Sequence, residues 1–475
     1  MLYHKLIEEH VDVDGNVLSD GKQSYSYFQI HERVMEIRAS FEKMDLQVGS
    51  RVLITATNCI ETILTVLACI ADGYIFVLLY PEMSEMEKEQ IRRNCTPDLC
   101  VDGITGFISR EKFRCVKERT VLPEDTLVSI LYTSGSDGFH KGVVASQKQI
   151  LFCCTAINQR LMNTERDRIL CCLPLAFDYG LYQVFLAFLN CSLLYIAKGV
   201  VLQKIPKMLS EWKITAFPII PSVMNLLIKT SLLKGLFLPE LRYITFTGER
   251  LSVKLIDELM KLFPKTEVVP MYGLTECKRV SIMPFGRNDK KKQGSCGLPL
   301  AGVRVWLADV DPKTGIGELV VNGPNVMEGY WGELGKSGEV YRTNSFTGER
   351  FIYTGDLFRI DTEGFLYFCG RKSRIIKVKG YRISCVRIEK LLEKLETIDE
   401  LAVLGIEDQY SGEKPAIFVC TGDEQIRERV CEIMKKQPRY MRNYELFVQK
   451  NSLPKTSNGK IDVLELKKRL QNCAE

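Results

Sequence analysis

Short apolar segments alternate with amphipathic helical patterns through the first three quarters of this chain. The apolar segments include RVLIT (51–55), IFVLLY (75–80), LVSILYT (127–133), RILCCLPL (168–175), SLLYIA (192–197), TAFPII (215–220) and LRYITFT (241–247). Strands that are apolar on both faces are typical of parallel sheets covered by helices, because both faces are then buried. The alternation therefore predicts an α/β fold whose sheets are mostly parallel.

The pattern changes twice further along the chain. From VRVWLAD (303–309) onward, turns rather than helices separate the strands, which predicts a β subdomain; after GRKSR (370–374) a small α+β pattern begins. A chain of 475 residues is longer than one hydrophobic core usually serves. We therefore predict a large N-terminal domain over residues 1–371 and a small α+β C-terminal domain over residues 372–475.

Composition argues against several classes of protein. The net charge of +5, from 64 basic and 59 acidic residues, is too small to predict a nucleic-acid partner. The most apolar segment, residues 184–197, is shorter than the roughly 20 residues of a membrane-spanning helix, so no membrane span is expected. Three of the four histidines lie near the N-terminus, which disfavours a Ser-His-Asp hydrolase. The 17 cysteines, without a recognisable secretory signal, predict a reduced protein of the cytoplasm.

The stretch YTSGSDGFHKGV (132–143) has the composition of a phosphate-binding loop. Glycines let the backbone come close to a ligand, while hydroxyl groups, backbone N–H groups and Lys141 supply donors and a positive charge. The interval from Gly135 to Lys141 does not fit the Walker A pattern. From this stretch alone, a phosphate loop and a flexible turn after a strand are equally good interpretations.

Four further segments follow this loop in order: MYGLTE (271–276), YTGDL (353–357), GRKSRIIKVKGYRIS (370–384) and LPKTSNGKID (453–462). Together the five segments resemble the motifs of the AMP-forming adenylate-forming ligases, the family of acyl-CoA synthetases, peptide-synthetase adenylation domains and luciferases. The resemblance covers nearly the whole chain. It implies a ligase that uses Mg-ATP to convert a carboxylic acid to an acyl-adenylate, releases pyrophosphate, and then transfers the acyl group to a thiol.

The resemblance assigns nucleotide-binding roles to individual residues. The β- and γ-phosphates of ATP would be held by Thr133, Ser134, Gly135, Ser136, Gly138 and Lys141. Thr275 would contact the α-phosphate, Glu276 would bind Mg²⁺, and Tyr272 would pack on the adenine. Asp356 and Arg371 would bind the ribose, although Asp356 taken alone is better explained by the chemistry of a tight turn.

The same resemblance places catalytic functions in the predicted C-terminal domain. Lys460 would bridge the carboxylate and the α-phosphate during adenylation. The segment around Gly380 would line the channel for the thiol, which belongs to coenzyme A or to the phosphopantetheine of a separate carrier protein. The small domain would rotate between the two half-reactions about residues near Lys372 and Ser373.

The sequence leaves the acid substrate open between carboxylic and amino acids. The predicted pocket residues are Asp178, Tyr179, Tyr182, Thr247 and Met271. Asp178 would hold the ammonium group of an amino acid in one interpretation and would cap the following helix in another. An acyl-CoA ligase and an amino-acid ligase that loads a carrier protein are therefore both possible. Arg279 would pair with an acidic substrate or, as we expect, lie at the surface.

Four residues depart from the family pattern, among them Arg387, which replaces a glutamate. Asp137 replaces a threonine of the loop, where its carboxylate would repel a phosphate, and His140 replaces a proline with little expected effect. Ser373 replaces an aspartate at the expected pivot. Asp137 and Ser373 motivate a third hypothesis, a non-catalytic nucleotide-binding homologue that docks a partner.

Overall fold

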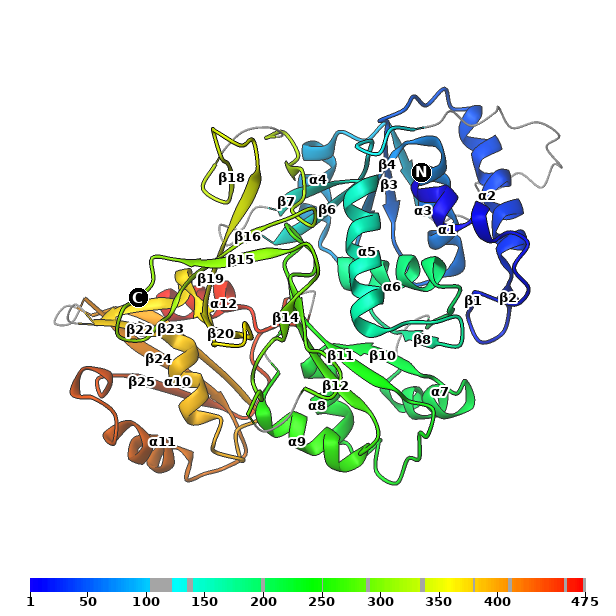
Figure 1. Ribbon diagram of the computed structural model, residues 1–475. Coiled ribbons are helices and arrows are strands. Elements are labelled where there is room, and N and C mark those ends of the chain that lie inside the picture. Colours follow the sequence, from blue (N-terminus) through cyan, green and yellow to red (C-terminus); the bar gives the residue numbers. More distant parts are fainter. Residues whose placement is uncertain are drawn as a thin grey trace. The chain divides into compact units, whose positions relative to one another are not determined.

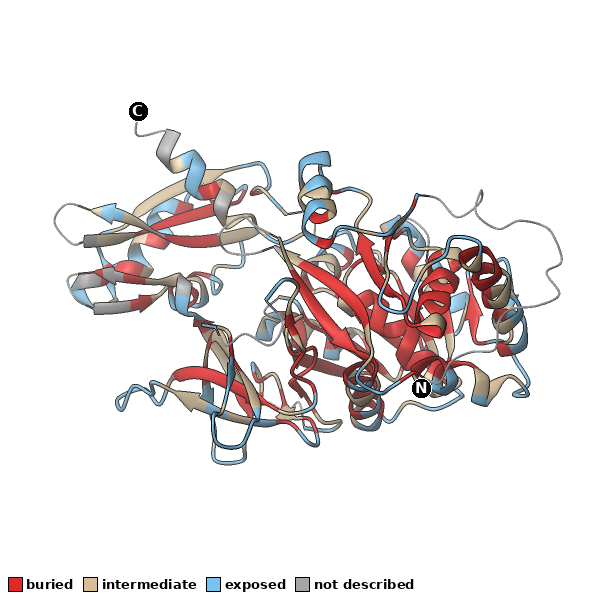
Figure 2. Ribbon diagram, turned by 90° about the horizontal axis from the view of Figure 1, so that it is seen from above, coloured by how far each residue is buried: buried red, intermediate tan, exposed pale blue. Residues whose placement is uncertain are grey.

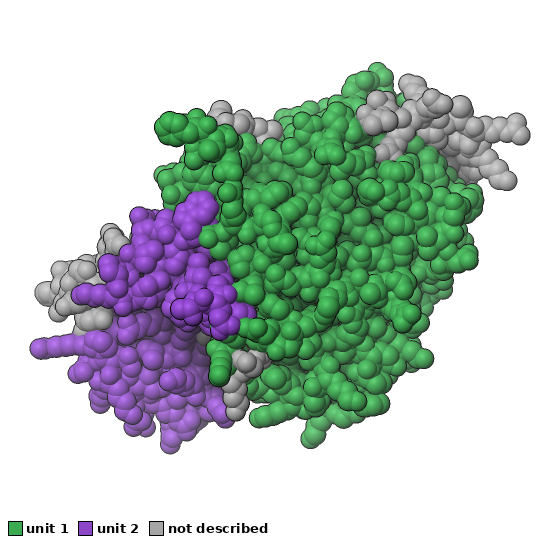
Figure 3. Space-filling view, in the orientation of Figure 1, with its two compact units in different colours: residues 1–305, 321–353 green, residues 306–320, 354–475 purple. Residues whose placement is uncertain are grey.

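The computed structural model describes residues 1–102, 122–134, 140–197, 201–249, 251–287, 291–333, 338–378, 381–408, 412–456 and 459–472. These residues form two compact units (Figure 3). Unit 1 comprises residues 1–305 and 321–353, and unit 2 comprises residues 306–320 and 354–475. The predicted domain boundary at residue 371 stays a prediction. Within the described ranges, none of the helices has the length and apolar character needed to span a membrane.

The first sheet of unit 1 has six strands, in the order β17-β7-β6-β4-β3-β5. Its parallel part consists of β5 (Leu99–Val101), β3 (Arg51–Thr55), β4 (Ile75–Leu79) and β6 (Leu127–Ser134). β7 (His140–Ser146) is antiparallel to β6, and β17 (Gly329–Tyr330) is antiparallel to β7. Helix α3 (Ile60–Asp72) connects β3 to β4, and α4 (Glu85–Cys95) follows β4. All five residues of β4 are buried, as expected for a strand covered on both faces. Figure 2 shows that buried residues gather in strands and in the helices beside them.

The second sheet of unit 1 has nine strands, in the order β14-β13-β12-β11-β10-β8-β9-β1-β2. Six adjacent strands are parallel: β1 (Leu18–Ser19), β9 (Leu193–Ile196), β8 (Arg168–Cys171), β10 (Ala216–Ile219), β11 (Tyr243–Phe246) and β12 (Glu267–Tyr272). The outer strands β2 (Ser24–Tyr25), β13 (Ser281–Ile282) and β14 (Leu298–Pro299) pair antiparallel. The remaining helices of unit 1 are α1 (Leu2–Leu6), α2 (Tyr27–Glu42), α5 (Gln147–Leu161), α6 (Asp178–Leu189), α7 (Ile205–Glu211), α8 (Pro221–Lys229) and α9 (Val253–Leu262).

The connections of the second sheet indicate where a ligand is expected. β9 follows β8 on one side, and β10 then lies on the other side of β8. The neighbouring strands β8, β10, β11 and β12 are labelled in Figure 1. In open parallel sheets, ligands bind at the carboxyl ends of the strands where the order reverses in this way. The residues that directly follow β8, β10, β11 and β12 therefore lie at the edge where we look for a site.

A large apolar core anchors these strands. Phe217 of β10 and Phe246 of β11 are fully or almost fully buried, together with Ile205 of α7, Met224 of α8 and Ile256 of α9. Burial of apolar side chains is the main favourable contribution to folding, at about 25 cal/mol per Å² of apolar surface. The core therefore fixes the position of the strand ends that carry the candidate site.

Unit 2 contains a five-stranded sheet in which the order is β22-β21-β24-β23 and β25 pairs with β24. Its strands are β21 (Ile375–Val378), β22 (Tyr381–Ser384), β23 (Glu400–Asp408), β24 (Gly412–Cys420) and β25 (Glu445–Gln449). Its helices are α10 (Cys385–Leu392), α11 (Ile426–Lys435) and α12 (Val463–Asn472). One core cluster contains Ile388 and Val430, and a separate cluster contains Phe418 and Leu466.

The predicted β subdomain is built from β15 (Arg304–Ala308), β16 (Gly317–Asn322), β18 (Tyr341–Thr343), β19 (Arg350–Ile360) and β20 (Leu366–Arg371). The division between the units falls within β15, β16 and β19. In unit 1, β18 pairs with the beginning of β19, and in unit 2 the end of β19 pairs with β20, both antiparallel.

The predicted α/β fold class is confirmed, including the β subdomain and the C-terminal α+β part. Each apolar segment quoted above has its strand in the structure. The expected tight turn at YTGDL is wrong, because these residues lie inside β19. Gly355 has a left-handed φ of +69°, and the pairing with β20 shifts register between Leu357 and Phe358. Such a bulge lets a strand continue through a Gly-Asp pair.

Candidate active site

The predicted phosphate loop joins two antiparallel strands of the first sheet. Thr133 and Ser134 end β6 and lie opposite Lys141 and His140, which begin β7. Thr133 Oγ1 donates a hydrogen bond of 3.5 Å to the Lys141 carbonyl oxygen. The other residues of this loop lie outside the described ranges, so their predicted roles stay predictions: Gly135, Ser136, Asp137 and Gly138.

One tyrosine connects this loop to the carboxylate predicted to bind Mg²⁺. The Lys141 ammonium lies over the ring of Tyr330, 5.5 Å from its centroid. The Tyr330 hydroxyl donates a hydrogen bond of 2.9 Å to Glu276 Oε1. Tyr330 reaches this place because β17 pairs with β7. The Glu276 carbonyl oxygen also accepts hydrogen bonds from Met327 N at 3.0 Å and from the Tyr341 hydroxyl at 3.2 Å.

The segment that carries Tyr272, Thr275 and Glu276 follows the carboxyl end of β12 and folds back tightly. Tyr272 is buried, and Thr275 and Glu276 are half-buried. A Cβ atom at Gly273 would lie 1.7 Å from the Lys278 carbonyl oxygen, so only glycine fits there. The close backbone approach fixes the spacing between the predicted adenine-binding and metal-binding residues.

His140 makes a contact that the usual proline of the family pattern lacks. Its Nε2 lies 3.3 Å from Glu87 Oε1 of α4. The other oxygen of Glu87 accepts hydrogen bonds from Ser84 N at 2.9 Å and Ser84 Oγ at 2.7 Å, which cap α4. Burial raises the pKa of Glu87, but the hydrogen bonds from Ser84 and His140 outweigh it, and the pKa lies below its ordinary value.

Two of the predicted pocket residues meet Arg279 at the carboxyl edge of the second sheet. Arg279 Nη1 donates a hydrogen bond of 2.8 Å to Thr247 Oγ1, directly after β11. Its guanidinium lies over the ring of Tyr179, 5.4 Å from the centroid. The Tyr179 hydroxyl is itself bonded to Thr245 at 2.8 Å. Arg279 is only 8% exposed, so the expected surface position is wrong: the hydroxyl and the ring provide a polar environment for the buried guanidinium.

Lys278, which no motif singled out, is buried beside the other pocket residues. It is 4% exposed, and its ammonium lies 5.2 Å from the centroid of the Tyr182 ring. Burial lowers the pKa of Lys278, and the negative charge of Asp178 acts in the opposite direction. Asp178 is half-buried as the first residue of α6, and Met271 is buried near the end of β12. Asp178 thus already has a cationic neighbour.

In unit 2, the two residues predicted to bind ribose form an ion pair. Asp356 and Arg371 lie opposite each other on β19 and β20, with 2.9 Å between Asp356 Oδ1 and Arg371 Nε. Asp356 is 2% exposed, whereas the side chain of Arg371 is 54% exposed. Gly355 N donates a hydrogen bond of 3.0 Å to Glu318 Oε1, which supports the backbone beside Asp356.

The expected pivot and the predicted catalytic lysine also lie in unit 2. Lys372 Nζ donates a hydrogen bond of 2.8 Å to Glu318 Oε2, and this bond raises the pKa of Lys372. Lys460 is exposed, and its carbonyl oxygen accepts a hydrogen bond of 2.8 Å from Thr456 N. Gly380 and the side chain of Ser373 lie outside the described part of the chain.

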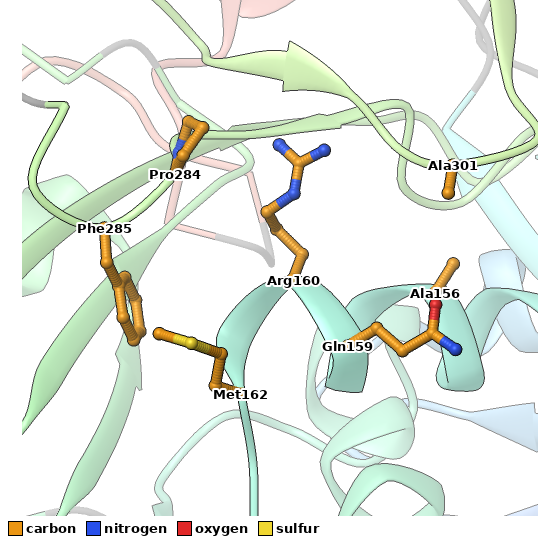
Figure 4. A pocket seen from close by; sticks show the side chains of 7 residues that line it. All are labelled: Ala156, Gln159, Arg160, Met162, Pro284, Phe285 and Ala301. Carbon is orange, nitrogen blue, oxygen red and sulfur yellow. The ribbon is translucent and has the colours of Figure 1, made fainter.

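A cavity of about 350 Å³ lies at a different place in unit 1 (Figure 4). It is lined by Ala156, Gln159, Arg160, Met162, Pro284, Phe285 and Ala301. The guanidinium of Arg160 donates hydrogen bonds to the carbonyl oxygens of Ile282, Leu298 and Pro299, which hold β13 and β14. None of the residues predicted to bind ATP or the acid lines this cavity, and we assign no ligand to it.

Two residues of the site, Tyr330 and Lys278, were not predicted. Tyr330 is 54 residues from Glu276 in the sequence and reaches it through strand pairing. Its segment EGYW matched the family pattern only weakly. Lys278 follows the YGLTE motif directly, and a lysine there looks like an ordinary surface residue until its burial is known.

Comparison with known proteins defines the class: an adenylate-forming ligase of the acyl-CoA synthetase type. The chain belongs to the AMP-binding enzyme family, whose model matches residues 8–331, and the AMP-binding enzyme C-terminal domain matches residues 387–460. The predicted family and the prediction of an enzyme are thereby confirmed.

Three relatives illustrate the range of the similarity. The 4-coumarate–CoA ligase of Pinus taeda is 24% identical over 506 residues, covering 96% of this chain and 92% of that protein. Surfactin synthase subunit 1 of Bacillus subtilis (strain 168) is 27% identical over 480 residues, covering 94% of this chain and 13% of that protein. The solved structure of o-succinylbenzoate coenzyme A synthetase from Bacillus subtilis, in complex with ATP and a magnesium ion, superposes with a TM-score of 0.84 at 21% identity, covering 98% of this chain and 99% of that one.

The residues around Glu276 fit a magnesium ion bound together with ATP. Mg²⁺ in nucleotide sites is usually held by one or two carboxylates, with phosphate oxygens and water completing its shell. Glu276 supplies one half-buried carboxylate, which Tyr330 orients. Among the described residues there is no group of three or more His, Cys, Asp or Glu side chains that could hold a metal ion alone. The donor set therefore suits a metal that arrives with its nucleotide.

Proposed function

We propose that the protein is a ligase that activates a carboxylic acid with Mg-ATP and transfers the acyl group to coenzyme A. The observation that carries the proposal is the contact of Tyr330 with both Lys141 and Glu276. This contact places a cation suited to phosphate near a carboxylate suited to Mg²⁺, as adenylation requires. The family match over residues 8–331 and the full-length similarity to a coenzyme A ligase support the same function.

In the first half-reaction, an oxygen of the acid attacks the α-phosphorus and pyrophosphate leaves. Lys141, with Thr133, Ser134 and the three loop residues Gly135, Ser136 and Gly138, would hold the β- and γ-phosphates, and Thr275 the α-phosphate. Glu276 would hold Mg²⁺, which when bound neutralises charge on the phosphate oxygens. Tyr272 would pack on the adenine.

Residues of unit 2 would complete both half-reactions. Asp356 would accept hydrogen bonds from the ribose hydroxyls, and its ion pair with Arg371 supports this role by holding both side chains ready. Lys460 would stabilise the charge that moves from the carboxylate to the phosphate. In the second half-reaction, the thiolate attacks the acyl carbon and AMP leaves, with the segment around Gly380 lining the thiol channel. The pivot between the two steps would lie near Lys372 and Ser373, at the predicted boundary of residue 371.

An amino-acid ligase that loads a separate carrier protein is the second candidate, since a peptide-synthetase relative matches 94% of this chain. The surroundings of Asp178 argue for the first candidate. An aspartate binds a substrate ammonium best when no other cation neutralises its carboxylate. The carboxylate of Asp178 already interacts electrostatically with the buried Lys278 ammonium. We further propose a reducing compartment such as the cytoplasm, because the cysteines in the described ranges are all free thiols.

The test is acid-dependent exchange of pyrophosphate into ATP, measured with a panel of carboxylic and amino acids. Lys460→Ala should lower the exchange rate about a hundredfold or more, as expected for loss of a charge that stabilises the transition state. Lys467→Ala is the control, because Lys467 is an exposed lysine of α12. If no acid supports exchange, so that Lys460→Ala changes nothing, the result would support the nucleotide-binding homologue instead. If exchange occurs and the Lys460 variant is as active as the wild type, the proposed role of Lys460 is wrong. Product analysis with coenzyme A or with a phosphopantetheine-bearing carrier protein identifies the acceptor.

A further inference from the structure

Arg279 is a buried charge that the proposed reaction leaves without a role. It is 8% exposed, and a guanidinium stays protonated at any pH at which a protein is folded. A buried charge is unfavourable unless an opposite charge or a full set of hydrogen bonds compensates for it. The partners of Arg279 therefore indicate whether it serves the fold or a ligand.

The two contacts of Arg279 supply no negative charge. Nη1 donates to the Thr247 hydroxyl at 2.8 Å, and the guanidinium lies over the Tyr179 ring at 5.4 Å. Nε is buried and has no hydrogen-bond partner among the residues that the structure describes. A guanidinium binds a carboxylate best through two parallel N–H groups, Nε and an adjacent Nη among them. Arg279 thus retains donor capacity for a carboxylate.

The carboxylates nearest in the chain and at this edge of the sheet have other partners. Asp178 and Glu276 both act electrostatically on Lys278. Glu276 also accepts the hydrogen bond from Tyr330 and is the proposed ligand of Mg²⁺. The negative charge that would match Arg279 is therefore expected from a ligand.

Arg279 also stands at the place where the acid is expected. Thr247 directly follows β11, at the carboxyl edge of the second sheet, and Tyr179 belongs to the first turn of α6. Arg279 is three residues beyond Glu276 in the segment that follows β12. Its guanidinium is thus held among predicted acid-pocket residues and on the same segment as the proposed metal ligand.

We propose that the acid substrate is a dicarboxylic acid, one carboxylate of which is activated while the second is bound by Arg279. This inference rests on the proposed ligase function and adds a substrate class to it. The second carboxylate would accept hydrogen bonds from Nε and a neighbouring Nη, while Thr247 and Tyr179 hold the guanidinium in place. An acid of similar size without the second charge would leave Arg279 unpaired.

The experiment compares matched pairs of acids in the pyrophosphate exchange assay. Each pair is a dicarboxylic acid and its monomethyl ester: malonate, succinate, glutarate and phthalate provide different lengths and shapes. The wild-type protein should use at least one diacid with a kcat/KM about thirtyfold or more above that of its ester, as expected when one partner of a buried charged pair is removed. The difference should appear chiefly in KM, since the second carboxylate does not react.

Three variants locate the source of that preference. Arg279→Met should lower kcat/KM for the diacid to about that for its ester and thereby remove the preference. Arg279→Lys keeps the positive charge but loses the two parallel N–H groups of the guanidinium, so part of the preference for the diacid should remain. This variant provides the test if the methionine variant does not fold. Arg166→Met is the matched control, because the Arg166 side chain is 90% exposed, and it should keep the full preference.

The possible failures are distinguishable. The inference is wrong if the kcat/KM for esters and monocarboxylic acids equals that for diacids. It is also wrong if Arg279→Met lowers exchange with both members of a pair equally. In either case Arg279 is structural and the proposed ligase function stands. If no acid of any kind supports exchange, the proposed function itself fails and the inference fails with it.

Discussion

Tyr330 contacts two groups of opposite charge with two parts of one side chain. Its ring faces the Lys141 ammonium, and its hydroxyl donates to the Glu276 carboxylate. A cation over an aromatic ring and a hydrogen bond to a charged acceptor are each favourable contacts. Tyr330 therefore orients both groups before a nucleotide binds, which lowers the entropy that binding must overcome.

Replacing Tyr330 by phenylalanine separates the two contacts. The ring under Lys141 remains, but Glu276 loses a hydrogen bond of the charged type, which contributes about 1.5–3 kcal/mol. We expect the Mg²⁺ concentration for half-maximal exchange to rise about tenfold, with little change in melting temperature. Titration of Mg²⁺ at saturating ATP measures the effect. An unchanged Mg²⁺ dependence would show that Tyr330 does not position the carboxylate.

At the residue level, the sequence predicts roles for residues within a motif and misses residues that reach the site from distant parts of the chain. Glu276 and Lys141 lie within recognisable motifs, so their roles follow from the family resemblance. Tyr330 lies far from both in the chain, and only the pairing of β17 with β7 brings it to them. A charged residue after a loop motif is usually solvated, so the sequence alone predicts Arg279 at the surface. Its burial depends on Thr247, which follows β11, and on Tyr179 of α6, both distant in the chain.

Helix α4 is connected to the phosphate loop through its N-terminal cap. Glu87 bonds Ser84 with one carboxylate oxygen and lies 3.3 Å from His140 with the other. The same carboxylate thus stabilises the first turn of α4 and holds the first residue of β7. The substitution of proline by histidine in this chain therefore adds a contact between the helix and the end of the loop.

The pH dependence of stability should report this contact. The folded pKa of Glu87 lies below its ordinary value of 4.5, so its stabilising contribution is present above pH 4.5 and is lost as the pH falls through the folded pKa. Glu87→Gln should therefore melt at a lower temperature than the wild type at pH 7, and the difference should shrink as the pH falls below about 4.

The matched control is Glu89→Gln, on the same helix with a side chain 48% exposed. Its melting temperature should stay close to that of the wild type at both pH values, because exposed ion pairs contribute little. A difference between the Glu87 variant and the wild type that persists at low pH would contradict the assignment to the carboxylate.

Most elements could be predicted because their residue patterns are strong. The apolar strands of unit 1 and the helical pattern of α11 were visible in the sequence, since burial dictates both periodicities. The end of the chain was assigned by its motif alone, and α12 directly after it was not predicted. The continuation of β19 through Gly355 was not predictable either, because a left-handed residue and a bulge leave the same sequence signature as a turn.

Over the whole molecule, cysteines in both units provide reporters of folding. Burial raises the pKa of Cys153 and of Cys171 to about 12 in unit 1, and of Cys385 to about 12 in unit 2. Because the thiolate is the reactive form, these thiols should resist alkylation at pH 8 in the folded protein. Among the cysteines in the described ranges, Cys100 is the exposed one and should react before the others.

Alkylation at increasing urea concentration should then distinguish the units. Each core cluster described for unit 2 contains fewer buried residues than the large core of unit 1 around Phe217. Because a smaller core stabilises a unit less, Cys385 should become reactive at a lower urea concentration than Cys153. Mass spectrometry of the labelled peptides measures both transitions. Coincident transitions would mean that the chain unfolds as one cooperative body.

The close approach at Gly273 has a thermodynamic consequence. Because the backbone there touches the carbonyl group of residue 278, the stretch from Tyr272 to Arg279 behaves as a single stiff piece that carries the proposed adenine, metal and diacid contacts. Two ligands that hold the same piece in one position bind with positive cooperativity, and linkage requires the gain in affinity to be equal for both ligands. Mg-ATP should therefore tighten the binding of the acid by the same factor by which the acid tightens the binding of Mg-ATP.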